Sequence, residues 1–367
     1  MLRNLKLKDY DFKLIFLVLA LSVMGVIAIA SAEPSLRNKQ MIGVIAGTCL
    51  MVVVSLIDYT KVLQLHWLIY AGNILLLLAV VFFGDDAKGA KRWLEIGGLT
   101  FQPSELAKIL LILFFAQFII VNKGRLNTFP VLASCLGLIA LPCFLVYLQP
   151  DLSTTIVIVV LFCVIMFAGG ISLKIVFTIL AVTIPALAII ITLAMNPDNN
   201  ILKDYQKDRV LAFINPEEYA SAEAYQQLNS VMAIGSGMLD GKGYQNNEIT
   251  SVKNGNFISE TQTDFIFAII GEEFGFKGCV AVIVLWLLLV FECVSVARKA
   301  KDDAGMLIAV GMGGLIAFQG FINIGVATFL LPNTGLPLPF VSYGLTSLLS
   351  LYIGMGFVIN VRLQAKN

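Results

Sequence analysis

The sequence is poor in charge. Lys, Arg, Asp and Glu make up 13% of its 367 residues, whereas soluble domains carry about 25%. Hydrophobic residues account for 58%. This composition excludes an ordinary soluble domain and predicts a protein that crosses a membrane many times. The net charge of +1 says little about partners, because the positions of Lys and Arg matter more than their sum. We expect a lipid bilayer around the chain and no nucleic-acid partner.

Histidine is nearly absent, and the cysteines are not paired in sequence. His66 is the single histidine, which argues against zinc centres, Ser-His triads and histidine proton relays. The six cysteines lie in or beside apolar runs without Cys-x-x-Cys spacing, so they predict buried thiols and neither disulfides nor a metal site. Any catalysis therefore depends on carboxylates, hydroxyls, lysines and arginines.

Long apolar runs recur along the chain. Each is about 18 residues or longer, enough to cross roughly 30 Å of hydrocarbon. They predict an all-α polytopic membrane protein, one domain over residues 1–367, with about ten transmembrane helices. The run from 265 exceeds one span, so its first part, through Gly278, is a candidate for a separate or re-entrant helix. The predicted spans are 14–31, 40–57, 66–83, 105–122, 129–148, 152–169, 173–194, 265–297, 304–329 and 340–361.

The distribution of positive charge predicts the orientation. The first apolar run ends in Ala30-Ser31-Ala32, which imitates a signal-peptidase site, but its length and the following spans favour an uncleaved helix. Lys and Arg gather at alternate ends of the spans, which predicts that both termini are cytoplasmic. The outer face then carries loops 84–104 and 195–264, and the second separates spans seven and eight. We expect these two loops to form the active-site face.

The first outer loop places the basic pair Lys91 and Arg92 beside Trp93. These side chains could bind a phosphate and stack on a sugar. Alternatively, Trp93 is an interfacial belt residue and the two cations are simply solvated.

The same loop then enters a helix. Ser104 fits an N-cap and Glu105 the first turn. Lys108 follows Glu105 at the i,i+3 spacing, near enough to neutralise it.

The second outer loop contains two predicted helical pieces and a glycine-rich turn. Residues 208–216 resemble a short interfacial helix that Pro216 ends, and 225–234 form a second amphipathic piece. The backbone amides of 235–243 could cradle a phosphate. The turn is not a Walker A loop, because Ser236 occupies the position of the required first glycine.

Two shorter polar segments interrupt the apolar runs. Asp151 lies between spans five and six, where a helix cap is the alternative to a role in binding. Three prolines in residues 331–344 exclude a helix there. Unpaired backbone at that depth needs protein or a watery cavity around it.

Three acids cluster where the second outer loop meets span eight. Asp264 precedes the span, and Glu272 and Glu273 follow a little over two turns on. Acids at a membrane boundary are costly and usually functional. The alternative is a capped helix start, with Thr263 as the N-cap and Asp264 favoured by the helix dipole.

The polar residues of the predicted outer face suit a substrate with an anionic head and a lipid tail. Cations can neutralise phosphate, and one carboxylate can act as a general base. The candidate site residues are Lys91, Arg92, Trp93, Gln102, Glu105, Lys108, Asp151, Arg209, Lys242, Glu260, Asp264 and Ser342.

Several motifs together resemble the SEDS family, the RodA, FtsW and SpoVE proteins of bacterial shape, division and sporulation. The resemblance covers nearly the whole chain in the right order. The motifs are Thr263-Asp264-Phe265-Ile266-Phe267-Ala268, Gly271-Glu272-Glu273, Gln102-Pro103-Ser104-Glu105, Gln149-Pro150-Asp151-Leu152, Ala233-Ile234-Gly235-Ser236-Gly237, Gly241-Lys242-Gly243 and Pro337-Leu338-Pro339-Phe340-Val341-Ser342-Tyr343-Gly344.

This resemblance implies a peptidoglycan glycosyltransferase of the bacterial cytoplasmic membrane. Such a protein polymerises lipid II together with a class B penicillin-binding protein, a transpeptidase. The resemblance also implies a catalytic role for Asp264 and a functional role for Trp93. One departure is Gln262, where the family commonly has His. The short termini resemble the elongation branch, RodA, more than the division branch.

The resulting hypothesis has Asp264 accept the proton of an attacking sugar hydroxyl. Lys91, Arg92, Arg209 and Lys242 are candidates to neutralise the pyrophosphate, and a divalent cation such as Mg²⁺ or Mn²⁺ could share that task. Two alternatives remain open: a lipid II flippase or other transporter, and a non-enzymatic scaffold for a penicillin-binding protein. Sparse charge within the spans, chiefly Glu105, Lys108 and Glu292, favours chemistry at the surface over transport.

Overall fold

The computed structural model describes most of the chain. It covers residues 10–365 except 88–89, 97–98, 179–180, 182–184, 186–191, 194–206, 208–210, 220–223, 246–250, 252–257 and 259–260.

Apolar helices dominate the described residues, and eight of these helices are long and apolar enough to cross a membrane. The shorter apolar helix α7 stands beside them. Each of these helices overlaps one of the predicted spans. The seventh predicted span, 173–194, lies largely outside the described residues, so the count of about ten stays a prediction. The helices are α1 (Phe12–Ala32), α2 (Arg37–Ser55), α3 (Tyr59–Gln64), α4 (His66–Phe83), α5 (Pro103–Val121), α6 (Phe129–Leu148), α7 (Leu152–Ala168), α10 (Tyr225–Ser236), α11 (Ile266–Lys299), α12 (Asp303–Ala327) and α13 (Leu345–Leu363).

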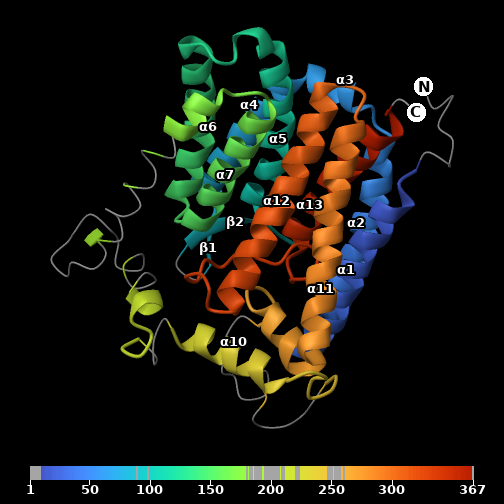
Figure 1. The fold of residues 1–367 in the computed structure, drawn as a ribbon, viewed down its shortest axis with the longest axis vertical. Coiled ribbons are helices and arrows are strands. Elements are labelled where there is room, and N and C mark those ends of the chain that lie inside the picture. Colours follow the sequence, from blue (N-terminus) through green and yellow to red (C-terminus); the bar gives the residue numbers. More distant parts are fainter. Residues whose placement is uncertain are drawn as a thin grey trace.

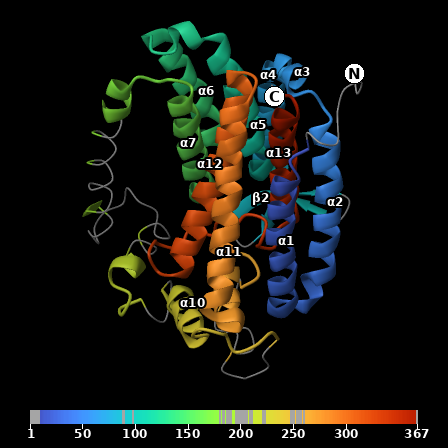
Figure 2. The same cartoon turned by 45° about the vertical axis from the view of Figure 1, so that its right-hand side comes forward.

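Helices α5, α12 and α13 form the middle of the bundle (Figures 1 and 2). Helix α5 packs against α4, α7, α12 and α13, and α13 also packs along α2. Helix α11 lies against α1 and α12. Close packing of α12 on its neighbours depends on small residues: a Cβ at Gly311 would lie 2.8 Å from Ile112 Cγ2 of α5. The core therefore surrounds the start of α5, which carries the charged residues Glu105 and Lys108.

The start of α1 and the end of α13 lie at the same end of the bundle, and α10 lies across the opposite end (Figure 1). Asn360 joins three elements at the first end, since its Nδ2 donates to Ser55 O (2.6 Å) and its Oδ1 accepts from Tyr59 N (3.0 Å). The loop between α2 and α3 is thereby joined to α13 at this end.

Loop 84–104 contains three short strands that the sequence did not predict. Strands β1 (Asp85–Ala87), β2 (Ala90–Ile96) and β3 (Leu99–Phe101) form an antiparallel sheet in the order β1-β2-β3. The register pairs Asp85 with Trp93 and Leu94 with Phe101. A small sheet satisfies backbone hydrogen bonds in a segment that leaves the bundle between two apolar helices. The protein is nonetheless predominantly helical.

Helix α11 is broken at Gly275, three residues before the end proposed from the sequence. Gly275 has φ 61° and ψ −158°, a conformation that favours glycine. The first part, Ile266 to the break, is therefore a short helix of its own. At the break it packs closely on the turn after α10, where a Cβ at Gly241 would lie 2.1 Å from Glu273 O.

The prediction that the backbone amides of the glycine-rich turn 235–243 bind a phosphate is wrong. The amides of Lys242 and Gly243 donate to the carbonyls of Glu272 (2.9 Å) and Glu273 (3.1 Å). The amides of Gly237, Met238 and Gly241 also donate to backbone carbonyls, so five amides of this turn already have partners. The glycines instead allow two backbones to approach.

Candidate functional site

Asp264 lies in a turn just before α11, half-buried. The helix begins at Ile266 with Phe265 in the N-cap position and no side-chain cap. The alternative interpretation, with Thr263 as N-cap and Asp264 in the first helical turn, is therefore wrong. Asp264 belongs to the irregular segment that leads into the helix.

Three consecutive carbonyls of this segment are bound by donors from two other elements. Tyr343 N donates to Gln262 O (2.9 Å), and Ser342 Oγ donates to Thr263 O (2.6 Å). Asn323 Nδ2 of α12 donates to Asp264 O (2.8 Å). Because backbone carbonyls outside a helix need partners when they are buried, these hydrogen bonds fix the segment that carries Asp264.

The proline-rich segment 331–344 lies beside the Asp264 carboxylate. It contains no helix, as its prolines predicted. Ser342 Oγ also accepts from Leu338 N (2.8 Å), and Asn323 Nδ2 donates to Leu336 O (2.7 Å), so the segment is held internally and to α12. A Cβ at Gly335, which has φ 71°, would lie 3.3 Å from Asp264 Oδ2. Glycine therefore leaves space next to the carboxylate.

Ser342 had been predicted to bind substrate. Its hydroxyl already donates one hydrogen bond and accepts another within the protein. Its observed contacts are those of a residue that orders the loop beside Asp264.

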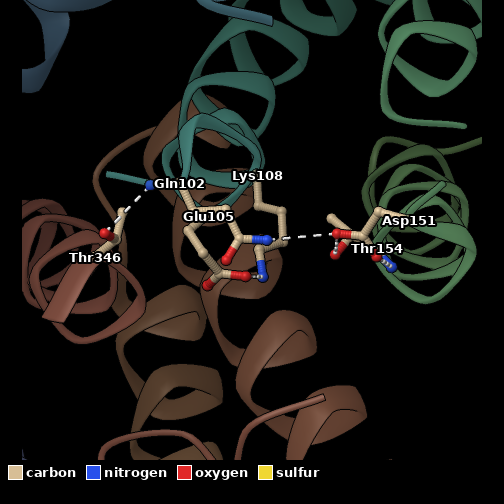
Figure 3. Close-up of polar contacts among 6 residues, drawn as sticks. All are labelled: Gln102, Glu105, Lys108, Asp151, Thr154 and Thr346. Atoms are coloured by element: carbon tan, nitrogen blue, oxygen red, sulfur yellow. Dashed lines mark hydrogen bonds and ion pairs between the residues drawn. The ribbon is translucent and has the colours of Figure 1, made fainter. Parts of the chain in front are cut away.

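A second cluster of polar side chains surrounds the start of α5 (Figure 3). Lys108 Nζ and Glu105 Oε1 form the predicted i,i+3 ion pair at 2.7 Å, and the two residues are 1% and 5% exposed. Gln102 Nε2 donates to Asp151 Oδ2 (3.4 Å), and Gln102 N donates to Thr346 Oγ1 of α13 (3.3 Å). The start of α5 is thus joined to α7 and α13.

The predicted N-cap of α5 is wrong by two residues. The N-cap is Gln102, Pro103 occupies the first turn, and Ser104 is buried. Proline suits the first helical position because its fixed φ matches the helix and its missing N–H is not needed there.

Asp151 caps α7, the alternative that the sequence left open. Its carboxylate accepts from Thr154 N (3.1 Å) and Thr154 Oγ1 (2.9 Å). Ser153 Oγ donates to Thr334 O, which joins the start of α7 to the segment beside Asp264. The cluster around Asp264 and the cluster at the start of α5 are therefore connected through segment 331–344.

Arg92 binds the turn between α6 and α7. Its Nε donates to Gln149 O (3.2 Å), and its Nη2 donates to Pro150 O. The guanidinium thereby pairs with carbonyls at the C-terminal end of α6, where a positive charge is favourable. Trp93 is half-buried in β2. The side chain of Lys91 lies outside the described residues.

Lys242 does not lie free at the outer face. Its Nζ donates to Glu272 Oε1 (2.9 Å), and Ser251 Oγ donates to Glu272 Oε2 (3.3 Å). The Glu272 carboxylate is almost completely buried. Lys242 therefore neutralises a buried acid at the break of α11. Arg209 and Glu260 lie outside the described residues.

Sequence reasoning missed Asn323 as part of this site. The residue lies in an apolar span, and a polar side chain inside a span is a signal for function or for helix contacts. Thr346, whose Oγ1 accepts from Gln102 N, was also missed, and it too is a polar residue in an apolar span. Within the described part of the chain, no group of three or more His, Cys, Asp or Glu side chains could hold a metal ion.

The fold and the site define a multi-pass helical membrane protein with an aspartate whose main chain is fixed among polar segments near one end. The chain matches the family model described as "Cell cycle protein", which covers FtsW, RodA and SpoVE, over residues 11–367, and it belongs to this family. The SEDS resemblance of the sequence is confirmed.

Curated relatives of similar length carry one activity in their names. The chain is 34% identical to "Peptidoglycan glycosyltransferase MrdB" of Escherichia coli K12, with 97% of this chain and 94% of the relative covered. It is 32% identical to "Probable peptidoglycan glycosyltransferase FtsW" of Geobacter metallireducens, with 99% and 97% covered.

Solved structures agree with the fold. A chain from a peptidoglycan synthase complex, described as coordinating polymerization and crosslinking, superposes with a TM-score of 0.80 at 30% identity, with 96% of this chain and 97% of that chain covered. The rod shape determining protein RodA of Thermus thermophilus gives a TM-score of 0.71 at 28% identity, with 96% of both chains covered.

Proposed function

We propose that this protein is a peptidoglycan glycosyltransferase that polymerises lipid II, with Asp264 as the general base. The observation that carries the proposal is the fixed position of Asp264, whose segment has three consecutive carbonyls bound by Asn323, Ser342 and Tyr343. A base that acts by position needs such support. The names of the relatives supply the reaction class.

In the proposed reaction, Asp264 accepts the proton of the GlcNAc 4-hydroxyl of an incoming lipid II. The freed oxygen attacks the anomeric carbon of the lipid-linked growing chain. The bond from this carbon to the pyrophosphate oxygen breaks, the configuration inverts, and undecaprenyl pyrophosphate leaves with the electron pair.

The leaving pyrophosphate needs positive charge, for which Lys91, Arg92, Arg209 and Lys242 are the proposed sources. The contacts of Arg92 favour it, because two of its five N–H groups bind carbonyls and the other three have no acceptor in the described part of the chain. Lys242 would have to share its ammonium with Glu272. A divalent cation, Mg²⁺ or Mn²⁺, could share this task, because Mg²⁺ binds substrate phosphates with only one or two protein carboxylates.

We also propose that the protein works with a class B penicillin-binding protein in the bacterial cytoplasmic membrane, with both termini in the cytoplasm. The likeness to a chain of a peptidoglycan synthase complex supports a partner. We place the protein in cell elongation, and complementation of strains depleted of RodA or of FtsW distinguishes this role from division.

The direct test uses the purified protein with its class B partner and labelled lipid II. Glycan strands resolved on a gel, absent when the protein is omitted, are the expected result. No strands, together with movement of lipid II across liposome membranes, would contradict the transferase and favour the flippase. No strands and no movement, with the partner still bound, would favour the scaffold.

A further inference from the structure

Asn323 connects the backbone of Asp264 to the proline-rich segment. It lies in α12 and is 1% exposed. Its Nδ2 donates to Asp264 O at 2.8 Å and to Leu336 O at 2.7 Å. One carboxamide therefore joins two irregular segments to a membrane-spanning helix.

The orientation of this carboxamide follows from its partners. Both contacts are carbonyl oxygens, which accept hydrogen bonds and cannot donate them, so the NH₂ group must face them. Each of its two N–H groups serves one segment. Oδ1 of Asn323 points elsewhere and has no hydrogen-bond partner in the described part of the chain. Only a side chain with two donors can replace both contacts.

The other two donors hold Asp264 less directly. Ser342 and Tyr343 bind the carbonyls of the two residues before it, and both belong to the proline-rich segment itself. Asn323 binds the carbonyl of Asp264 from a regular helix. Supports on rigid elements hold a group more accurately than supports on loops. Segment 331–344 is also held by Ser153 of α7 and by Leu331 N, which donates to Gly325 O of α12 (3.1 Å). Asn323 binds the Asp264 carbonyl itself to α12, so its loss would free residue 264 more than it frees the segment.

We propose that Asn323 is a positioning residue for Asp264. This inference rests on the proposed function. The Asn323 carboxamide fixes the Asp264 main chain and segment 331–344 at one separation, with Gly335 beside the carboxylate. The carboxylate then faces the acceptor hydroxyl without having to be ordered during the reaction. Asn323 itself touches no reacting atom.

The test compares Asn323→Leu and Asn323→Ala with Gln319→Leu. Gln319 lies one helical turn earlier in α12 and is also buried, but its carboxamide has no hydrogen-bond partner among the described residues. Removing that carboxamide breaks no hydrogen bond to the Asp264 segment. We expect the Asn323 variants to lower kcat by about 10- to 100-fold while KM changes less than about 3-fold. We expect Gln319→Leu to polymerise at the wild-type rate.

A second measurement does not depend on activity. The variant Asp264→Cys reacts with a thiol reagent at a rate that reports the position and mobility of residue 264, once the native cysteines are subtracted by labelling the parent protein. We expect Asn323→Leu, added to this variant, to change that rate several-fold and Gln319→Leu to leave it unchanged.

Three outcomes overturn the inference. The first is a wild-type kcat in the Asn323 variants, and the second is a loss of rate that only matches the loss of folded, partner-bound protein. The third is an unchanged rate of thiol labelling at position 264. Absence of polymer from the wild type would instead contradict the proposed function, and the labelling rates would then decide the positioning role alone.

Discussion

Lys108 and Glu105 form an ion pair that is almost completely removed from solvent. Removing one partner of a buried pair leaves the other charge uncompensated, which costs far more than the pair itself contributes. The Lys108 side chain is 1% exposed and depends on this one carboxylate, since no other acceptor contacts its ammonium among the described residues.

We therefore predict that Lys108→Met lowers the free energy of unfolding by about 3–5 kcal/mol. The double variant Glu105→Gln/Lys108→Met should recover much of that loss, because no unpaired charge remains. As a control, Lys123→Met removes the exposed pair with Asp303 and should cost no more than about 1 kcal/mol. Unfolding in detergent micelles measures all three. Equal losses for Lys108→Met and Lys123→Met would contradict the buried pair.

Asp58, at the end opposite α10, contributes a pH-dependent term. Burial raises the pKa of its carboxyl group, but hydrogen bonds from Thr60 and Gln364 outweigh burial, so the pKa lies below its ordinary value of 3.8. A carboxyl group whose pKa is lowered by folding stabilises the folded state at pH values above its pKa in the unfolded chain. This stabilisation is lost as the pH falls through its pKa in the folded protein.

We predict that wild type is more stable than Asp58→Asn between pH 5 and 7, by a constant margin. The margin should shrink once the pH falls below 3.8. Unfolding midpoints of both proteins at a series of pH values measure it. A margin that does not change down to the lowest accessible pH would show that the Asp58 charge is not involved.

At the scale of elements, the break in α11 determines how the chain reaches Asp264. The sequence indicated it, because the apolar run from 265 is too long for one span. The site of the break could not be predicted, since it depends on contacts with a distant turn. A Cβ at Gly275 would lie 2.4 Å from Gly241 N and 2.8 Å from Leu239 O.

We predict that Gly275→Ala destabilises the protein by at least about 2 kcal/mol, because this positive-φ conformation is essentially restricted to glycine and costs other residues about 1–3 kcal/mol, and the new methyl group clashes with backbone. Gly235→Ala is the matched control, since a Cβ there meets nothing within 4 Å. In helix α10 alanine is favoured over glycine, so the control should be neutral or slightly stabilising. A thermal unfolding series decides, and similar midpoints for the two variants would refute the close contact.

The same contrast between local and distant information explains the rest of the site. The Glu105–Lys108 pair was predictable because both residues lie on one helix. The cap at Asp151 was likewise visible from local sequence. The ion pair of Lys242 could not be predicted, because its partner, Glu272, comes 30 residues later. Asn323 was missed because its two acceptors belong to separate loops.

At the scale of the whole molecule, segments from distant parts of the sequence meet around one carboxylate. The turn before α11, segment 331–344 and α12 hold Asp264. Ser153 connects the start of α7 to segment 331–344. Thr346 connects α13 to the start of α5. The apolar composition was sufficient to predict the helical bundle. The convergence of these segments required the structure, because apolar periodicity says nothing about which loops touch.

If Asp264 is the base in glycan polymerisation, its charge is essential, and Asp264→Asn removes this charge with little change in shape. The most direct measurement is therefore the rate of glycan-strand formation from lipid II by Asp264→Asn with the class B partner. Asp303→Asn is the control, since that carboxylate belongs to an exposed pair at the start of α12. We predict no polymer from folded, partner-bound Asp264→Asn and a wild-type rate from Asp303→Asn. Polymer from Asp264→Asn at a rate near that of the wild type would contradict it.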